Sequence, residues 1–229
     1  MAAYGASDMA RSVGSVTSLD TANINVTGAD LALITVAGEV ASGNNIPTLV
    51  WDPAGNNESM TGQIAEISAG NFCDMELEYL NDPTAANAPV RVSWSLSTDY
   101  CFVGGLFCTG AANIVATDTD NDSFGLTGTA LSATVPNVVS GDLVVDAAMI
   151  GFNNDLTPGA NQTERNDGGV SYLRTAWSTQ AGADGGVMSW SFSDPSYGGI
   201  SIAVRIPDAG GGGGPDPENK LLTLIGVGM

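Results

Sequence analysis

Hydrophobic and polar residues alternate with a period of two in several stretches of this chain. Met75, Leu77 and Tyr79, for example, are separated by Glu76 and Glu78. Such alternation is typical of a β-strand with one buried side and one solvent-facing side, so we expect these two glutamates to face water. The same pattern recurs over residues 90–97, 188–193 and 200–206.

Other stretches predict further strands. Largely apolar runs over residues 100–109 and 142–152 are typical of strands that are buried on both faces. Residues 22–27 and 30–37 are expected to pair with each other, and residues 60–68 fit a strand or a short helical turn.

Turn-forming residues such as Asp52-Pro53 and Asp194-Pro195 separate these runs, and no long amphipathic helical stretch is visible. About ten to twelve short strands separated in this way predict an all-β fold, an antiparallel, jelly-roll-like β-sandwich. We place this domain at residues 12–207, with extended arms on either side at residues 1–11 and 208–229.

Two segments of the chain resemble one another. Residues 90–110 and residues 187–206 share a serine-rich strand around a tryptophan, a short acidic turn, a tyrosine and a Gly-containing apolar strand. Each order is typical of a β-hairpin with an amphipathic first strand and a buried second strand. We interpret the two segments as quasi-equivalent centres of the sheets in a sandwich. The alternative is that two β-hairpins resemble each other by chance.

The C-terminal arm differs in composition from the rest of the chain. Five glycines at 210–214 form a tether, and Pro215 and Pro217 stiffen the segment after it. An apolar segment at the end of such a tether is expected to dock on a neighbouring protein by strand addition or in a groove, or else to be a frayed tail. The residues expected to bind a partner are Lys220, Leu221, Leu222, Leu224, Ile225 and Val227.

Charge excludes several functions. The chain has six Lys and Arg residues against twenty-five Asp and Glu, a net charge of −19, and no histidine. Nucleic acids and anionic membranes attract clustered cations, so we expect neither as a partner. Catalysis through an imidazole cannot occur, and the commonest zinc sites are excluded as well. The negative charges of the chain repel one another, and dissolved salt screens this repulsion. The charge therefore fits a protein from a salty environment.

Cysteine usage and the N-terminus bear on the compartment. Cys101 and Cys108 are seven residues apart and fall on opposite faces if one strand carries both, and a third cysteine is Cys73. Such thiols are expected to be small buried hydrophobes and to indicate assembly in a reducing compartment. No secretory signal and no apolar run long enough to span a membrane are visible.

The C-terminal half resembles a recurrent jelly-roll-like β-sandwich domain of bacterial surface proteins and phage virion structural proteins. The resemblance is carried by GDLVVD, by TPGANQTER and by GGVMSWSFS with the closing strand, and it extends to DLALITVAGEV and VRVSWSLSTDY in the N-terminal half. It covers roughly residues 12–207. Members of that group are structural or adhesive modules, so the resemblance implies a fold and a non-enzymatic role.

Few residues suggest chemistry. Asp118, Asp120 and Asp122 have the spacing of the first ligands of a Ca²⁺ loop, although Ser123 stands where such loops have glycine, and a solvated acidic turn is the alternative. Trp51 and Trp177 lie outside the alternating strands and are candidates for stacking on sugars. A second pair of tryptophans is expected in the core, at positions 94 and 190. No other cofactor is expected.

Together these features predict a virion structural protein that is not an enzyme: a phage capsid decoration (cement) protein or a tail-associated protein. It would be anchored through its arms to capsid or tail subunits, as a homo-oligomer, after assembly in the host cytoplasm. The alternative is a carbohydrate-binding or adhesive module displayed on a virion or on a cell surface.

Overall fold

In the computed structural model, most of the described residues lie in antiparallel strands, which confirms the predicted all-β sandwich class. The residues that the structure describes are 1–38, 47–69, 73–84, 86–114, 118–125, 127–196 and 198–210. The six tail residues predicted to bind a partner, from Lys220 to Val227, therefore lie outside the described part of the chain.

The N-terminal half forms one sandwich. Its first sheet, called here the first inner sheet, has the order β1 (Ala3–Ser12), β11 (Cys101–Thr109), β4 (Leu31–Gly38), β8 (Cys73–Asn81) and β7 (Gly62–Ala69). The first outer sheet has the order β2 (Val16–Asp20), β10 (Val90–Thr98), β5 (Pro47–Trp51) and β6 (Glu58–Ser59). A short ribbon of β3 (Ile24–Asn25) and β9 (Asn87–Ala88) completes this half.

The C-terminal half forms a second sandwich. The second inner sheet has the order β12 (Thr119–Phe124), β19 (Gly199–Ile206), β14 (Leu143–Ile150), β17 (Leu173–Ala181) and β16 (Thr163–Val170). The second outer sheet has the order β13 (Gly128–Thr134), β18 (Val187–Ser196) and β15 (Thr157–Pro158). A single 3-10 turn within the described ranges, η1 (Gly182–Asp184), precedes β18.

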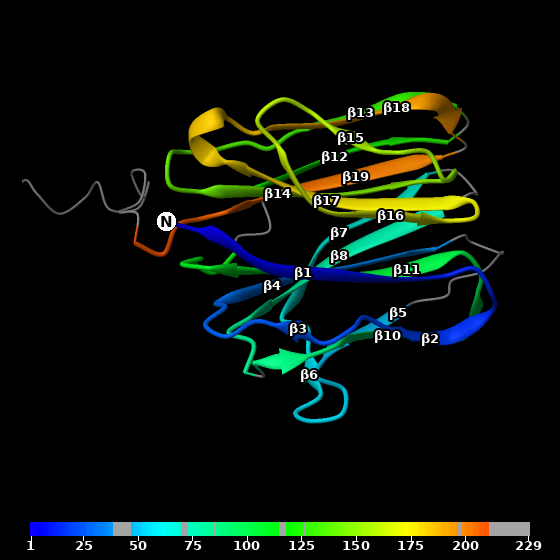
Figure 1. The fold of residues 1–229 in the computed structure, drawn as a ribbon. Coiled ribbons are helices and arrows are strands. Elements are labelled where there is room, and N and C mark those ends of the chain that lie inside the picture. The colour runs from blue at the N-terminus through cyan, green and yellow to red at the C-terminus, as the bar shows by residue number, and fades with distance from the viewer. Residues whose placement is uncertain are drawn as a thin grey trace, which may run out of the picture.

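The two sandwiches are stacked, so the molecule has four layers, in the order first outer, first inner, second inner and second outer sheet (Figure 1). Each inner sheet is consequently covered on both faces. This explains the largely apolar runs in the sequence, because β11, β14 and β19 at the centres of the inner sheets are buried along nearly their entire length.

The two sandwiches have the same topology. In chain order the equivalent strands are β1 and β12, β2 and β13, β4 and β14, β5 and β15, β7 and β16, β8 and β17, β10 and β18, and β11 and β19. With this correspondence the order of the two inner sheets is identical, and so is the order of the three shared strands of the outer sheets. Most successive strands of this correspondence alternate between the two sheets of a unit as in a jelly roll; the exceptions are β7 with β8 and β16 with β17, which are neighbours in the inner sheets. The chain is therefore a tandem pair of jelly-roll-like units.

Side-chain details repeat in both units. The Asp8 carboxylate accepts a hydrogen bond from the Ala22 backbone N–H at 2.9 Å, and the Asp120 carboxylate accepts one from Thr134 N–H at 2.6 Å. Both pairs are separated by fourteen residues in the sequence. In the first unit this hydrogen bond links β1 to the residues that follow β2, and in the second unit it links β12 to the end of β13.

The two tryptophans predicted to be in the core are equivalent as well. Trp94 lies opposite Pro47 between β10 and β5, and Trp190 lies opposite Pro158 between β18 and β15. Both indoles are buried, which confirms the prediction. The sequence likeness between residues 90–110 and 187–206 therefore marks equivalent positions in two units.

Several expectations about organisation were wrong. The chain has nineteen strands in its described part, arranged as two sandwiches, where about ten to twelve in one domain were expected. Residues 1–11 are not an arm: β1 pairs with β11 along its length, since its apolar positions complete the inner sheet. Strands β3 and β4 do not pair with each other; β3 pairs with β9, and β4 pairs with β11 and β8. Residues 60–68 form a strand, β7.

The two resembling segments are not hairpins either. Strands β10 and β11 belong to opposite sheets, and so do β18 and β19. The reason is that the serine-rich strand has only one apolar side, so it forms an outer layer, whereas the apolar strand needs cover on both sides and joins an inner sheet.

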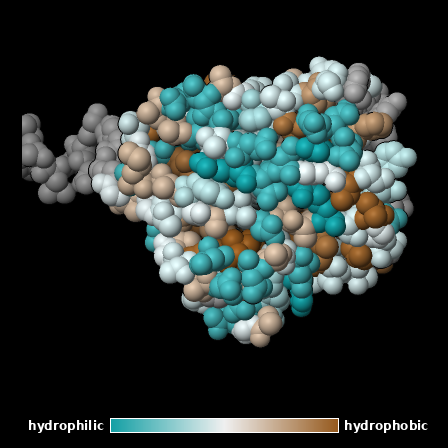
Figure 2. Space-filling model, in the orientation of Figure 1, coloured by the Kyte–Doolittle hydropathy of each residue, from teal (hydrophilic) through white to brown (hydrophobic). Residues whose placement is uncertain are grey.

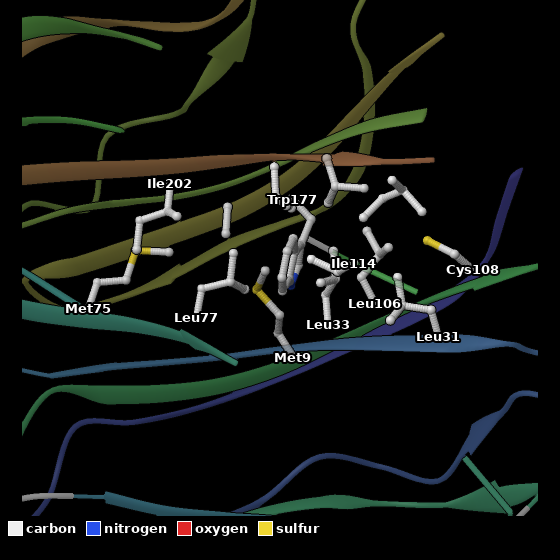
Figure 3. Packing of buried hydrophobic residues seen from close by; sticks show 14 of the residues in the cluster. Met9, Leu31, Leu33, Met75, Leu77, Leu106, Cys108, Ile114, Trp177 and Ile202 are labelled. Carbon is white, nitrogen blue, oxygen red and sulfur yellow. The ribbon is translucent and has the colours of Figure 1, made fainter. Parts of the chain in front are cut away.

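A continuous apolar core lies between the two inner sheets (Figure 3). Strand β1 lies beside β16 at one edge, and β7 lies beside β12 at the other. Because β1 corresponds to β12 and β7 to β16, these are the same contact seen from the two units. The sandwiches therefore pack about an approximate two-fold axis.

The segments that leave the two units meet near that axis. Ala112 N–H donates to the Pro207 carbonyl at 2.8 Å, and Ala209 N–H donates to the Gly110 carbonyl at 2.9 Å. The linker after β11 and the chain after β19 are thus paired antiparallel at the end of the molecule where the N-terminus lies (Figure 1).

Candidate functional site

Neither tryptophan proposed for sugar stacking is accessible. Trp51 is fully buried in the first sandwich, where its ring lies 4.7 Å from that of Phe107. Trp177 is fully buried between the two inner sheets, and a Cβ added to Gly104 would lie 2.9 Å from its indole nitrogen. The stacking hypothesis is therefore wrong for both residues. Trp177 instead fills the space that Gly104 leaves in the facing sheet, and Figure 3 shows its indole among the apolar side chains of the core.

The three aspartates proposed as calcium ligands do not converge on one point. Asp122 accepts a hydrogen bond from Ser132 N–H at 2.8 Å, and Asp120 accepts one from Thr134 N–H at 2.6 Å. Both amides belong to β13, the edge strand of the second outer sheet. The carboxylates of β12 thus satisfy backbone donors that an open edge would otherwise present to another chain.

Asp118 has a different set of partners. It is buried, accepts a hydrogen bond from Asn137 Nδ2 at 2.8 Å and forms an ion pair with Arg205 Nη1 at 2.7 Å. Arg205 also donates from Nε to Asp142 at 2.6 Å. Within the described ranges, no group of three Asp, Glu, Cys or His side chains is placed to hold a metal ion. Asp118 precedes β12, whereas Asp120 and Asp122 lie within it, and each of the three carboxylates binds partners of its own.

All five arginines have partners within the protein. Arg11 crosses from β1 to the second unit and donates to Thr175 and Asn166, while Arg165 stacks on the Tyr4 ring with its Cζ 4.2 Å from the ring centre. Arg165 also donates to Thr179 Oγ1 at 2.7 Å. The remaining three pair with carboxylates: Arg91 with Asp20, Arg174 with Asp155 and Asp167, and Arg205 with Asp118 and Asp142.

This use of the arginines has an electrostatic consequence. The cations of the described part hold strands and the two units together, and they are not gathered into a basic patch. With a net charge of −19, the surface that remains is acidic. It attracts cationic partners and repels nucleic acid and anionic membranes.

A buried carboxyl group in the second unit was not anticipated from the sequence. Asp146 lies on β14, faces the second outer sheet and is 0% exposed. It accepts hydrogen bonds from Trp190 Nε1 at 2.7 Å and from Ser201 Oγ at 2.8 Å. Burial raises the pKa of Asp146 to about 7, although the bonds from Ser201 and Trp190 oppose the shift. The signal available in the sequence was this single acid within the otherwise apolar residues 143–150.

Asp146 is an isolated group. Its pKa is governed by burial and its two hydrogen-bond donors, and no other charged group of the described part contributes measurably. A catalytic acid must reach its substrate, and a side chain without exposed surface does not. We therefore interpret Asp146 as a structural group whose charge state affects stability.

The glutamates of β8 are less exposed than their alternation predicts. Glu76 and Glu78 are half-buried, and Gln63 of β7 donates to Glu76. Burial, followed by the hydrogen bond and charge of Glu76, raises the pKa of Glu78 to about 8, and burial also raises the pKa of Glu76. Glu76 lies opposite Val36 of β4 and Glu78 lies opposite Ile34. The two glutamates are therefore on the face of the first inner sheet that packs against the first outer sheet. The expected fully wet charged face is wrong for these two residues.

The cysteines lie as predicted where the structure describes them. Cys101 is buried between the first inner and outer sheets, and Cys108 is buried between the two inner sheets, on the opposite face of β11. Burial raises the pKa of Cys101 to about 11 and that of Cys108 to about 12. Both thiols are free and unreactive hydrophobes. The side chain of Cys73 lies outside the described set.

An exposed group of apolar side chains lies at the end of the molecule opposite to the N-terminus. Tyr172 is 59% exposed, and its ring lies 5.6 Å from that of Tyr100 and 6.1 Å from that of Phe152, in edge-to-face contacts. Val13 comes directly after the last pair of the β1–β11 ladder, next to Tyr100. We call these four residues the aromatic end surface. It joins turns from both units. Figure 2 shows a largely hydrophilic face with some brown side chains toward its right-hand end.

The sequence contains little that would reveal this surface. Tyr100 has a positive φ of 46° in the turn between β10 and β11, and Tyr172 comes after Ser171, with a φ of 48°, in the turn between β16 and β17. The two turns are more than seventy residues apart. Only the stacking of the two units brings them together.

Comparisons with known proteins add little. No protein family matches this sequence, and no curated protein is similar to it. A solved structure titled Red Clover Necrotic Mosaic Virus is 12% identical, with 80% of this chain and 82% of that chain covered and a TM-score of 0.27. Another, of Cucumber Necrosis Virus, is 12% identical, with 90% and 89% covered and a TM-score of 0.26. Likeness at this level supports no inference about function. Among the described residues, no helix is long and apolar enough to cross a membrane.

Proposed function

We propose that this protein is a non-enzymatic structural component of a virion, specifically a phage capsid decoration protein or a tail-associated protein. The observation that carries the proposal is the build of the molecule: two equivalent sandwiches share one continuous apolar core, and the arginines of the described part serve internal contacts. Such a molecule offers a stable block with an acidic surface. The resemblance of its sequence to domains of virion and surface proteins supports the same interpretation.

The C-terminal segment is the proposed anchor. In the described part of the chain the last strand ends at Ile206, and in this proposal the block folds without the tail. Residues 221–227 are apolar and come directly after the single lysine, Lys220. In this proposal the tail attaches the acidic block to neighbouring virion subunits, which can be copies of the same chain, during assembly in the host cytoplasm.

Incorporation into particles tests the proposal. A chain that ends at Gly210 should keep the β-sheet circular dichroism spectrum and the cooperative unfolding of the full chain. It should be missing from purified particles of the phage that carries the gene, as measured by mass spectrometry. A chain without residues 211–229 that is incorporated at the normal level would refute the anchoring role. Absence of the full-length protein from purified particles would refute the virion role altogether.

The second candidate is a carbohydrate-binding or adhesive module on a virion or cell surface. The exposed rings of Phe152 and Tyr172 are the observation that favours it, in place of the two buried tryptophans. A glycan array would test it, because binding that depends on stacking should be lost when Tyr172 is replaced by serine.

A further inference from the structure

The aromatic end surface is a solvent-exposed apolar area. Phe152 and Tyr172 are 39% and 59% exposed, and Val13 is 53% exposed. Val13 belongs to the first unit, whereas Phe152 and Tyr172 belong to the second. The Tyr172 ring contacts Phe152 and also Tyr100, which belongs to the first unit. Exposed apolar side chains that gather on an otherwise acidic, polar protein mark a surface for interaction.

We propose that the aromatic end surface of one copy binds the apolar segment 221–227 of a second copy, which joins copies head to tail. This inference rests on the proposed function and deepens it, because it names the receptor for the anchoring tail.

The positions of the two elements favour a second copy over the same one. The chain after β19 leaves beside the N-terminus, and the aromatic end surface lies at the opposite end (Figure 1). Strand β1, with ten residues, runs from one end to the other, a distance of about 30 Å at ~3.3 Å per residue. The ten residues 211–220 span about 35 Å only when they are fully extended, so they would have to be completely stretched to reach the far end of their own molecule. They reach a neighbour more readily.

Charge is complementary in the same arrangement. Lys220 directly precedes the apolar segment. The aromatic end surface is flanked by Asp99, next to Tyr100, and by Asp155, whose side chain is 88% exposed although it also pairs with Arg174 at 3.0 Å. An ammonium group carried with the apolar segment onto this surface meets carboxylates. The five arginines are already engaged in internal contacts, so the cation must come from another molecule or from the tail.

An apolar peptide fits this surface better than a sugar. A sugar requires flat, open ring faces, and Tyr100 is half-buried beneath its edge contact with Tyr172. Val13 adds an aliphatic side chain that offers no stacking platform. Leucine and isoleucine side chains can pack against both kinds of residue, because apolar burial is not directional.

Head-to-tail contacts between unlike surfaces form rings or open chains. Association should therefore continue beyond a dimer and depend on concentration. Sedimentation velocity between about 1 and 200 µM tests this with the full-length protein. The wild type should sediment as growing assemblies, and L222D/I225D in the tail and F152S/Y172S on the surface should each remain monomeric. The matched control, V139S/V187S, changes two exposed valines elsewhere and should behave as the wild type does.

A labelled peptide separates the tail from its receptor. A fluorescein-labelled peptide of residues 216–229 should bind the full-length L222D/I225D protein, whose own tail is disabled. Adding F152S/Y172S to that protein should weaken binding at least tenfold in fluorescence anisotropy, with an unchanged circular dichroism spectrum. Equal binding to both proteins would overturn the inference, and so would a wild type that is monomeric at every concentration.

Two further outcomes are informative. Glycan binding that is lost in F152S/Y172S, with no peptide binding, would assign the surface to a saccharide and overturn the inference. Particles that exclude the tail variant but incorporate F152S/Y172S normally would leave the proposed function intact and refute this receptor alone.

Discussion

The charge of Asp146 should make the stability of this protein depend on pH. The carboxyl group is fully buried, and its pKa is raised to about 7 by that burial, compared with about 3.9 in an unfolded chain. Between these two values the folded protein binds a proton that the unfolded chain does not bind. Stability from this group is therefore present below about pH 4 and is lost as the pH rises to about 7.

The magnitude comes from the difference between the two pKa values. About three pH units, at about 1.4 kcal/mol for each unit, give about 4 kcal/mol. Asp146→Asn should remove this loss. The asparagine resembles the protonated acid, since its Oδ1 can accept from Trp190 and its Nδ2 can donate to Ser201 Oγ. The variant should match the wild type near pH 4 and exceed it by about 4 kcal/mol near pH 8.

Urea unfolding followed by tryptophan fluorescence, at intervals from pH 4 to pH 8.5, measures the difference between the two proteins. Using the difference cancels the titration of groups common to both, which include Glu76 and Glu78. Asp184→Asn is the matched control, because it removes one negative charge from an exposed position. A difference between D146N and wild type that stays constant across this range would refute the reasoning.

Other substitutions and conditions test the packing and the charges. Gly104→Ala should destabilise the protein by about 1–3 kcal/mol, because its Cβ would lie 2.9 Å from the facing indole, whereas Gly14→Ala has open space and should change the urea midpoint little. Asp120→Ala should cost about 1 kcal/mol by leaving a β13 amide without its partner; calcium at about 5 mM should not raise the melting temperature, and a rise that D120A abolishes would contradict this. Sodium chloride at about 0.5 M should raise the melting temperature by screening a net charge of −19, and a fall would show that the internal ion pairs dominate. Cys101 and Cys108 should resist iodoacetamide in the folded protein and react in urea, as measured by mass spectrometry.

Much of the local structure was predictable because the burial of a strand is recorded in its own residues. Alternation identified β8, β10, β18 and β19, and the spacing of Cys101 and Cys108 placed them on opposite faces of one strand. The same rule put Trp94 and Trp190 in the core. These predictions depend only on a side-chain period of two, which neighbouring residues are sufficient to establish.

Candidate functional residues were less predictable because their roles depend on distant partners. Trp51 and Trp177 lie at positions with no clear alternation, and only the facing sheets show that both are buried. The carboxylates of Asp118, Asp120 and Asp122 have a spacing that also fits a metal loop. Their actual partners are an arginine, an asparagine side chain and two backbone amides that the strand's own sequence does not reveal.

The amino-acid sequence alone establishes an all-β chain whose strands have assignable faces, together with an excess of acid that excludes several partners. The tertiary structure adds that there are two units rather than one, that their inner sheets face each other, and that Tyr100 and Tyr172 meet at one end. The physical reason is that a run of apolar residues requires cover on both sides but does not specify which strands supply it. That choice is made by pairing and packing between segments far apart in the chain.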